Sequence, residues 1–258
     1  MFNLLKKIYW LMSAQFGLDA RRFIQSLLGI PRYVNDWFSF RKNYSGKVTF
    51  FPCLHDWCEE GGTASGEYFW QDLYVAQQVF STNPNRHVDI GSRVDGFAAH
   101  VASFREIEIF DIRPITSNVP GMVFRQADLM NPIDVPESYC DSLSCLHALE
   151  HFGLGRYGDP INPEGHIIGL HNMVKILKPG GVFYLSSPIG LERVEFNGQR
   201  VFDPQKLVQL AAEQGLLLKS FSSVQLGGVL QEANDIALEI ARLGKNRYAL
   251  GVFTFIKQ

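Results

Sequence analysis

The sequence is poor in cysteine and has no long apolar run. Only four of its 258 residues are cysteine, too few for a disulfide framework, and no signal peptide precedes them, so we expect a reducing cytoplasm. The apolar N-terminal stretch is interrupted by Lys6 and Lys7. Its longest clean run, residues 8–12, falls far short of the roughly 20 residues that a membrane-spanning helix needs. A span at this end is therefore excluded.

Acidic residues are scarce near the N-terminus. Residues 1–47 hold eight Lys/Arg and two Asp/Glu, although the whole chain carries 24 and 26. This asymmetry favours an anionic surface or partner for the N-terminus over a nucleic-acid-binding protein. A chain with 46% hydrophobic residues can bury one sizeable core, so we expect an N-terminal helical extension, 1–46, and one main domain, 47–258.

Residues 3–30 have the apolar spacing of one or two short amphipathic helices, which Pro31 is expected to end. Two interpretations remain open. These helices could bind a membrane surface or a partner, or they could simply pack across the main domain.

Residues 50–66 form a glycine-rich, polar stretch that we expect to be a loop capping the cofactor or substrate, with His55 as a substrate contact. Cys53, Asp56 and Cys58 could be read with His55 as metal ligands. No second Cys/His pair follows at a zinc-like spacing, so we assign no metal. Ser65 is a plausible N-cap for a helix over 66–80, whose expected buried stripe is Phe69, Leu73, Ala76 and Phe80.

From residue 86 onward, strand and helix patterns alternate, which predicts an α/β fold with a parallel sheet. Expected strands are 86–90, 107–110, 122–126, 141–146, 182–185, 216–224 and 248–256, and expected helices are 97–104, 163–178, 203–214 and 230–242. Gly180 and Gly181 are expected to end the helix 163–178, and Asn197-Gly198 predicts a two-residue hairpin turn. No helix is expected between residues 111 and 122.

Polar residues follow several of these strands. Gly91 and Gly96 allow a sharp turn after the first strand, and Asp111 could accept hydrogen bonds from both hydroxyls of a ribose. With Asp128, the segment HALEH from 147 to 151 and LKPGG from 177 to 181, this order resembles the class I S-adenosylmethionine-dependent methyltransferases. The resemblance covers residues 86–258 and implies a Rossmann-like sheet of seven strands with the last one antiparallel.

The resemblance also implies S-adenosylmethionine as the cofactor and a role for each site residue. The turn would pass under the methionine and ribose, Asp111 would bind the ribose, Asp128 the adenine amine and Asp89 the amino group. The implied cofactor contacts are Tyr68, Gln71, Asp89, Gly91, Ser92, Gly96, Asp111 and Asp128. Each has an ordinary alternative, since an acid at a strand end is often only a helix cap and Tyr68 and Gln71 suit a solvated helix end.

Arg93 stands where the family usually has a second glycine. Its side chain could fill the pocket, or it could point away and bind the cofactor carboxylate or a phosphate with two hydrogen bonds. On the second alternative, Arg93 is also a cofactor contact. The same residue argues against nicotinamide dinucleotides, whose pyrophosphate needs glycine at this place.

His147, Glu150 and His151 follow the fourth strand, where the resemblance places substrate-facing groups. His151 is our candidate general base, and a helical segment would put His147 on the same face. Two alternatives remain: Glu150 and His151 could only orient the loop, and methyl transfer can proceed by positioning without a base.

The glycine-rich loop 152–159 carries Arg156 and Tyr157, and Arg200 lies in the hairpin, which suggests a hydroxyl-rich, anionic substrate. The combination of CLHDWCEEGGTASG at 53–66, HALEHFGLGRYGD at 147–159 and the hairpin also resembles an uncharacterised bacterial methyltransferase-like (DUF268-type) family associated with cell-surface polysaccharide synthesis. That resemblance implies a sugar, nucleotide sugar or surface-glycan precursor as substrate. The alternative is an inactive methyltransferase-like scaffold that docks a partner or an anionic membrane.

Overall fold

The computed structural model describes residues 2–59, 61–62, 64, 66–132, 134–225 and 227–258. The chain divides into two compact units, Met1–Thr63 and Ala64–Gln258, and the proposed capping loop 50–66 falls across this division. Ser65, expected to cap a helix, lies outside the described residues.

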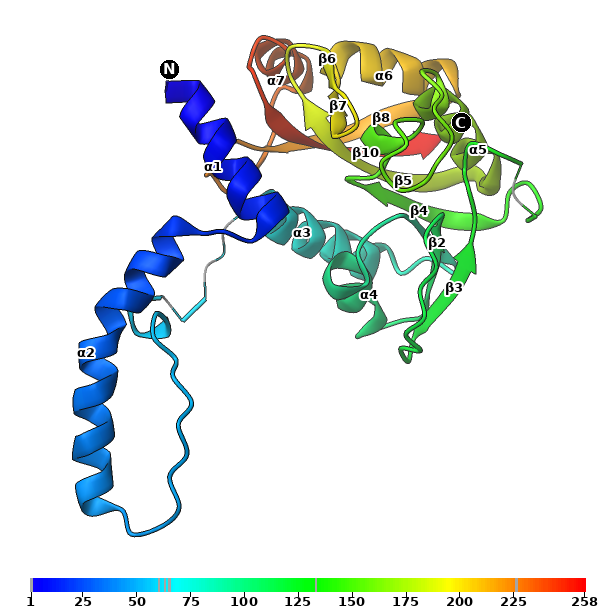
Figure 1. The fold of residues 1–258 in the computed structure, drawn as a ribbon. Helices are drawn as coiled ribbons and strands as arrows, with labels where there is room; N and C mark the ends of the chain where they lie inside the picture. The colour runs from blue at the N-terminus through cyan, green and yellow to red at the C-terminus, as the bar shows by residue number, and fades with distance from the viewer. Residues whose placement is uncertain (1, 60, 63, 65, 133, 226) are drawn as a thin grey trace. The chain divides into compact units, whose positions relative to one another are not determined.

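The N-terminal unit consists of two α-helices and a short 3-10 turn, with bounds α1 Phe2–Phe16, α2 Ala20–Asn43 and η1 Asp56–Cys58 (Figure 1). Asp19 caps α2 by accepting from the backbone N–H groups of Arg21 and Arg22. The expectation that Pro31 ends the helix was wrong, because α2 continues through it to Asn43. A proline removes one helical hydrogen bond, and the chain segment 50–57 packs along α2 and supports it. No helix among the described residues combines the length and apolarity that crossing a membrane requires.

The second unit is built on an eight-stranded sheet with the order β3-β2-β1-β4-β5-β10-β8-β9. The strands are β1 His87–Ile90, β2 Ile107–Asp111, β3 Met122–Gln126, β4 Cys140–Leu146, β5 Leu177–Ile189, β8 Leu216–Val224, β9 Leu230–Glu232 and β10 Ala249–Lys257. The first five run parallel, and β10 is inserted antiparallel between β5 and β8. The predicted class is confirmed, with one strand more than expected.

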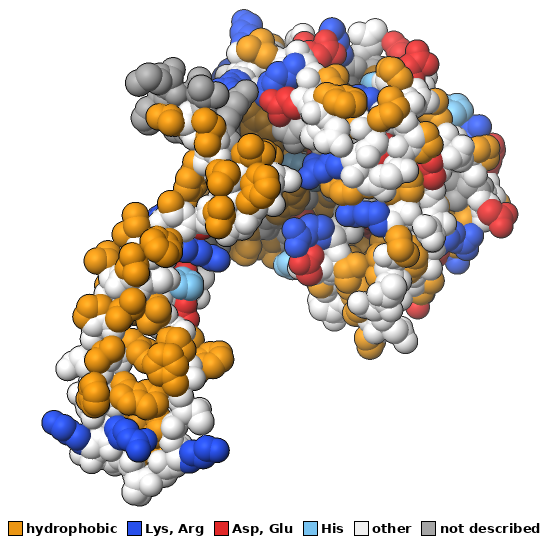
Figure 2. Space-filling view, viewed as in Figure 1, with side chains coloured by type: hydrophobic (Ala, Val, Ile, Leu, Met, Phe, Trp, Pro, Cys, Tyr) orange, Lys and Arg blue, Asp and Glu red, His pale blue; other side chains and the backbone are white. Residues whose placement is uncertain are grey.

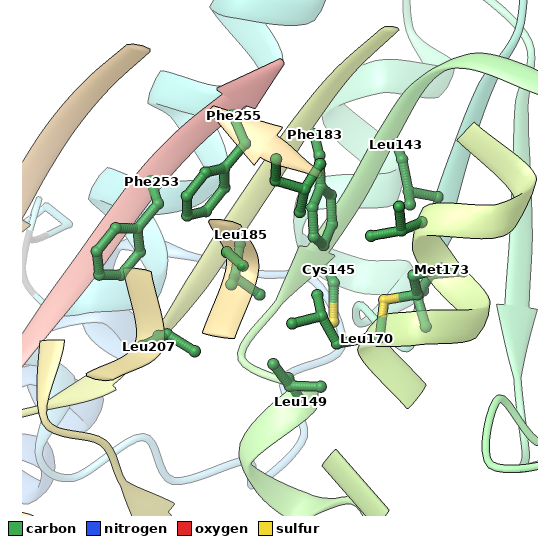
Figure 3. Close-up of a cluster of buried hydrophobic side chains, with 14 of the residues drawn as sticks. Leu143, Cys145, Leu149, Leu170, Met173, Phe183, Leu185, Leu207, Phe253 and Phe255 are labelled. Atoms are coloured by element: carbon green, nitrogen blue, oxygen red, sulfur yellow. The ribbon is translucent and has the colours of Figure 1, made fainter. Parts of the chain in front are cut away.

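Helices cover both faces of this sheet (Figure 1). They are α3 Glu67–Thr82, the π-turn η2 Val94–Ala98, α4 Ala99–Ala102, η3 Leu149–His151, α5 Gly165–Ile176, α6 Pro204–Glu213 and α7 Ile236–Leu243. Figure 3 shows one of two apolar layers, in which Leu170 and Met173 of α5 and Leu207 of α6 lie with side chains of β4, β5 and β10. The other layer joins α3 and α4 to the opposite face. Burial on both faces fixes the strand ends that carry the site.

Two local expectations about where helices begin and end were wrong. The segment 177–181 belongs to β5, where Leu177 pairs with Cys140 and Val182 with Ser142, so the intervening residues bulge out and Gly180 takes the positive φ this needs. Residues 230–232 form the edge strand β9, and the helix begins only at Ile236.

The buried face of α3 was predicted only in part, because Ala76 is buried as expected but the two phenylalanines are not. Phe69 and Phe80 are exposed, whereas Gln71, Asp72, Val75, Ala76 and Val79 are buried. The hairpin was correct: β6 Arg193–Glu195 pairs antiparallel with β7 Gln199–Val201.

Candidate functional site

A cavity of about 580 Å³ opens at the carboxyl ends of β1, β2, β3 and β4. Its wall includes the turn after β1, the residues that follow β2 and β3, the start of α3 and the loop after β4. The predicted residues on its lining are Tyr68, Gln71, Gly91, Ser92, Arg93, Gly96, Asp111, Asp128, His147, His151, Arg156 and Tyr157. The cavity has the size and place of a small-molecule site in an open α/β sheet.

The turn after β1 is held from below by a buried carboxylate. Asp89 accepts from the Ser92 backbone N–H at 3.0 Å, from the Ser92 hydroxyl at 2.8 Å and from the Ser144 hydroxyl at 2.5 Å. Burial raises the pKa of Asp89 to about 7, although these donors oppose the shift. Asp89 is fully buried and lies outside the cavity lining, so it shapes the turn from beneath.

Gly91 is required at this turn for two reasons. Its φ of +74° lies in the left-handed region, and a Cβ there would come within 2.9 Å of the Ala148 Cβ. Its N–H donates to the Phe110 carbonyl at 2.9 Å. The turn is therefore packed tightly between β2 and the loop after β4.

Arg93 does not plug the cavity. Its side chain is 71% exposed and forms a two-point contact with Asp95, with Nε and Nη2 at 2.9 and 2.6 Å from the carboxylate oxygens. The guanidinium therefore lies at the rim of the cavity, where a bidentate contact holds it. Of the two placements that the sequence left open, the structure shows the one in which the interior stays accessible.

Asp111 and Asp128 lie at the ends of neighbouring strands and both line the cavity. The Asp111 carboxylate accepts from the backbone N–H, Nε and Nη2 of Arg113, at 2.8, 3.0 and 2.6 Å. Asp128 accepts from the Met130 N–H at 2.9 Å and from Asn131 Nδ2 at 2.7 Å. A carboxylate offers about four acceptor positions, so Asp111 with its three donors has about one position left, and Asp128 with its two donors has about two. Two carboxylates held at the ends of adjacent strands suit a ligand that carries a hydrogen-bond donor at each of its two ends.

His147 is the centre of a buried polar network that the sequence did not reveal. Its backbone has φ +51°, an uncommon conformation for a non-glycine residue that tends to occur at functional sites. Its Nδ1 lies 2.8 Å from Gln71 Oε1. The Gln71 amide nitrogen donates to Asp72 at 2.9 Å, so Oε1 must be the acceptor. The proton of neutral His147 therefore sits on Nδ1.

The other nitrogen of His147 faces an acid. Nε2 lies 3.4 Å from Glu67 Oε1, an ion-pair distance without hydrogen-bond geometry, and the Tyr248 hydroxyl donates to the same oxygen at 2.7 Å. Burial lowers the pKa of His147, but contact with Glu67 and the negative charges of Glu150 and Asp72 outweigh it, and the net pKa is raised. The Tyr68 ring lies over the imidazole, with centroids 4.5 Å apart.

His151 has the opposite electrostatic environment. Its Nδ1 lies 2.8 Å from the Gly198 carbonyl, which fixes the proton on that nitrogen and leaves Nε2 as the basic atom. Burial and the positive charge of Arg156 lower the pKa of His151 to about 4. The segment is not α-helical, so the condition under which His147 and His151 would share one helix face is not met.

Glu150 does not line the cavity. It is fully buried, accepts from the Ser187 hydroxyl at 3.2 Å, and burial raises its pKa. Arg200 is also buried, and its guanidinium donates to the carbonyls of Glu150, Phe152 and Pro163. Its predicted substrate contact is therefore replaced by a structural one, in which Arg200 ties down the loop after β4. His55 belongs to the N-terminal unit, where its ring lies near Asp56 and Glu59.

The loop after β4 meets the end of β2 through one aromatic ring. The guanidiniums of Arg113 and Arg156 lie 4.3 and 5.2 Å from the centroid of Tyr157. Arg113 was not predicted from the sequence, nor were Glu67, Asp72 and Tyr248. Glu67 and Asp72 could have been found as carboxylates in the first turns of the helix that precedes the first strand. Nothing local indicated Arg113 or Tyr248.

Part of the chain is similar to a known protein family. A family model described as "Caenorhabditis protein of unknown function, DUF268" matches residues 124–235, which supports the expected DUF268 resemblance for that segment. No curated protein gives a significant sequence match.

Solved structures give many matches. A protein from Galdieria sulphuraria, described as a candidate sarcosine dimethylglycine methyltransferase, is 15% identical, with 72% of this chain and 84% of that chain covered and a TM-score of 0.50. The 1,6-didemethyltoxoflavin-N1-methyltransferase of Burkholderia thailandensis, solved with 1,6-didemethyltoxoflavin and S-adenosylhomocysteine, is 14% identical, with 93% and 92% covered and a TM-score of 0.49. Together with the strand order, the likeness to the Galdieria sulphuraria structure shows that the eight-stranded sheet and its helices form a Rossmann-like methyltransferase fold.

Proposed function

We propose that the protein is an S-adenosylmethionine-dependent methyltransferase acting on a small polar substrate. The observation that carries the proposal is the convergence of a glycine turn and two strand-end carboxylates, Asp111 and Asp128, on one cavity. Acceptors at these places suit the ribose hydroxyls and the adenine amine of an adenosine group. The apolar lining residues Leu129 and Met130 suit the faces of a flat base.

The charges around the cavity also suit the cofactor. When bound, S-adenosylmethionine supplies an electrophilic methyl group on a positively charged sulfur. Asp72 lines the cavity beside Gly96, and Asp89 lies beneath the turn. Burial raises the pKa of each acid, and a nearby cation would favour their charged forms. Cofactor binding and deprotonation should therefore favour each other.

His151 is the proposed proton acceptor. The Gly198 contact leaves Nε2 of the neutral ring without a proton, and this nitrogen lies 3.8 Å from Glu150 Oε1. The pKa of about 4 keeps the imidazole neutral near pH 7 but also makes it a weak base, so the proposal rests on the place of His151 on the cavity wall. His147 is less suited to this role, because its Nε2 is buried against Glu67. We assign His147 to positioning the start of α3 on the loop after β4.

The substrate is proposed to be a hydroxyl-rich, anionic molecule such as a nucleotide sugar or surface-glycan precursor. Arg156 and Tyr157 support this, because they place a cation and a phenol on the cavity wall beside His151. All four cysteines lie in described parts of the chain and are free, which fits the proposed cytoplasmic location.

Titration calorimetry with S-adenosylmethionine and S-adenosylhomocysteine tests the proposal. We expect saturable binding to the full chain, and Asp111→Asn should weaken it by roughly 10–100-fold, as for loss of a hydrogen bond to a charged group. Asp134→Asn is the matched control, because Asp134 is exposed and lies outside the cavity. Absence of heat with either ligand at high concentration would overturn the proposal in favour of an inactive scaffold.

A further inference from the structure

Helix α2 carries an apolar stripe that no described part of the N-terminal unit covers. Spacings of three or four residues put its members on one helix face, and each is between 43% and 66% exposed. The uncovered face of α2 consists of Phe23, Leu27, Ile30, Val34 and Phe38. Figure 2 shows hydrophobic side chains along the visible side of this unit.

The opposite face of α2 is the one that the returning chain covers. A Cβ on Gly29 would lie 1.8 Å from the Leu54 carbonyl oxygen, so the backbones touch there. The Tyr33 ring meets Phe50 edge-on at 5.4 Å, and Arg32 lies 5.1 Å from the Trp57 ring. The returning chain therefore packs on the more polar side of α2, and the apolar side stays exposed. A helix in an ordinary globular protein does the reverse and buries its apolar side.

The charges beside this face identify the partner. Basic residues stand at both ends of the stripe, with Arg21 and Arg22 before it and Arg41 and Lys42 after it, and Asp36 is the only acid inside α2. Residues 1–47 have eight Lys/Arg against two Asp/Glu. A broad apolar face with aromatic residues and flanking cations is the pattern of a helix that lies in the interface of an anionic bilayer.

We propose that α2 binds anionic lipid surfaces through its uncovered face, with the basic residues at its ends contacting lipid headgroups. The apolar side chains enter the boundary between headgroups and acyl chains, and the helix lies parallel to the membrane. This function is separate from methyl transfer. It does not depend on the identity of the cavity's ligand.

Flotation of the full chain with vesicles tests the proposal. One set of vesicles contains phosphatidylcholine with about 30 mol% phosphatidylserine, and the other contains phosphatidylcholine alone. We expect flotation with the anionic vesicles, and a decrease in flotation when the salt is raised from about 0.1 M to about 0.5 M. Arg41→Gln/Lys42→Gln should reduce both the binding and its salt dependence.

Matched variants locate the surface. Phe23→Ser/Leu27→Ser should lower the partition coefficient at least about tenfold, because it removes two side chains from the buried face. Phe196→Ser/Leu238→Ser also removes an exposed phenylalanine and leucine, from the second unit, and should leave binding unchanged. All four side chains are exposed, so both variants should fold, which circular dichroism would verify.

Three outcomes would overturn the proposal. The wild-type chain could fail to float with anionic vesicles, or both double variants could lose binding equally. Sedimentation could instead show a dimer that only Phe23→Ser/Leu27→Ser dissociates, without lipid binding, in which case a second copy covers this face.

Discussion

Replacing Gly91 with alanine tests the tight packing of the turn on which the site rests. The left-handed φ of +74° costs an alanine about 1–2 kcal/mol. The new Cβ would also lie 2.9 Å from the Ala148 Cβ, and overpacking of this kind costs about 1–3 kcal/mol. We therefore expect Gly91→Ala to lower the free energy of unfolding by roughly 2–5 kcal/mol.

Gly215→Ala is the matched control, because Gly215 has φ +81° with nothing within 4 Å of an added Cβ. It should show the conformational cost alone, so the two variants should differ by at least about 1 kcal/mol. At about 2–4 °C per kcal/mol for a unit of this size, calorimetry resolves that difference. The double variant Gly91→Ala/Ala148→Gly removes the Cβ that the new alanine would meet. Its loss of stability should therefore be smaller than the sum of the two single losses, and the difference is the coupling energy between the two positions. Equal losses for Gly91→Ala and Gly215→Ala would refute the close approach of the turn to Ala148.

Three further predictions follow from the charges. Glu67→Gln should lower the pKa of His147 in an NMR titration, because it removes the facing carboxylate. Glu137 is exposed, so Glu137→Gln should leave the pKa of His147 unchanged. An unchanged pKa of His147 in Glu67→Gln would contradict the buried network around it. Arg93→Ala should change stability by less than about 0.5 kcal/mol and leave cofactor affinity unchanged, since its pair is exposed; strong loss of affinity would show that Arg93 contacts the ligand. Burial lowers the pKa of His87 from 6.5 to about 3, so the neutral buried imidazole costs no stability above pH 6.5, and the free energy of unfolding falls as the pH drops toward 3. At pH 5 this decrease is about 2 kcal/mol, and His87→Gln should remove about that much of the pH dependence measured by urea unfolding. If the free energy of unfolding of His87→Gln depended on pH as in the wild type, His87 would not be a buried neutral imidazole.

The sheet and the strand-end residues could be predicted because their signals are local. Short apolar runs that end in glycine or an acid specify both a buried strand and the edge where its last side chain lies. Asp111 and Asp128 were placed on one cavity in this way, and the structure puts both on its lining. Their cofactor roles remain predictions.

The errors arose where distant parts of the chain decide the outcome. Helical periodicity favoured Phe69 and Phe80 as the buried side of α3, but contacts with His147 and the cavity wall bury Gln71 and Asp72 instead. No local pattern indicates that polar residues face inward here. The Tyr248 contact with Glu67 joins residues 181 positions apart, which a single sequence does not reveal.

Arg200 shows the same limit. An arginine in a hairpin beside a glycine-rich loop suggests a ligand contact, yet its donors serve three backbone carbonyls. Buried carbonyls need donors, and only the folded loop shows where they lie.

A crystal structure of the complex with S-adenosylhomocysteine is the most direct test of the central claim. The account predicts a ribose hydroxyl within about 2.6–3.2 Å of the Asp111 carboxylate, the adenine amine beside Asp128 and the amino-acid end over the Gly91 turn. Ligand bound elsewhere, or an adenosine that contacts neither carboxylate, would contradict the assignment of this cavity as a methyl-donor site.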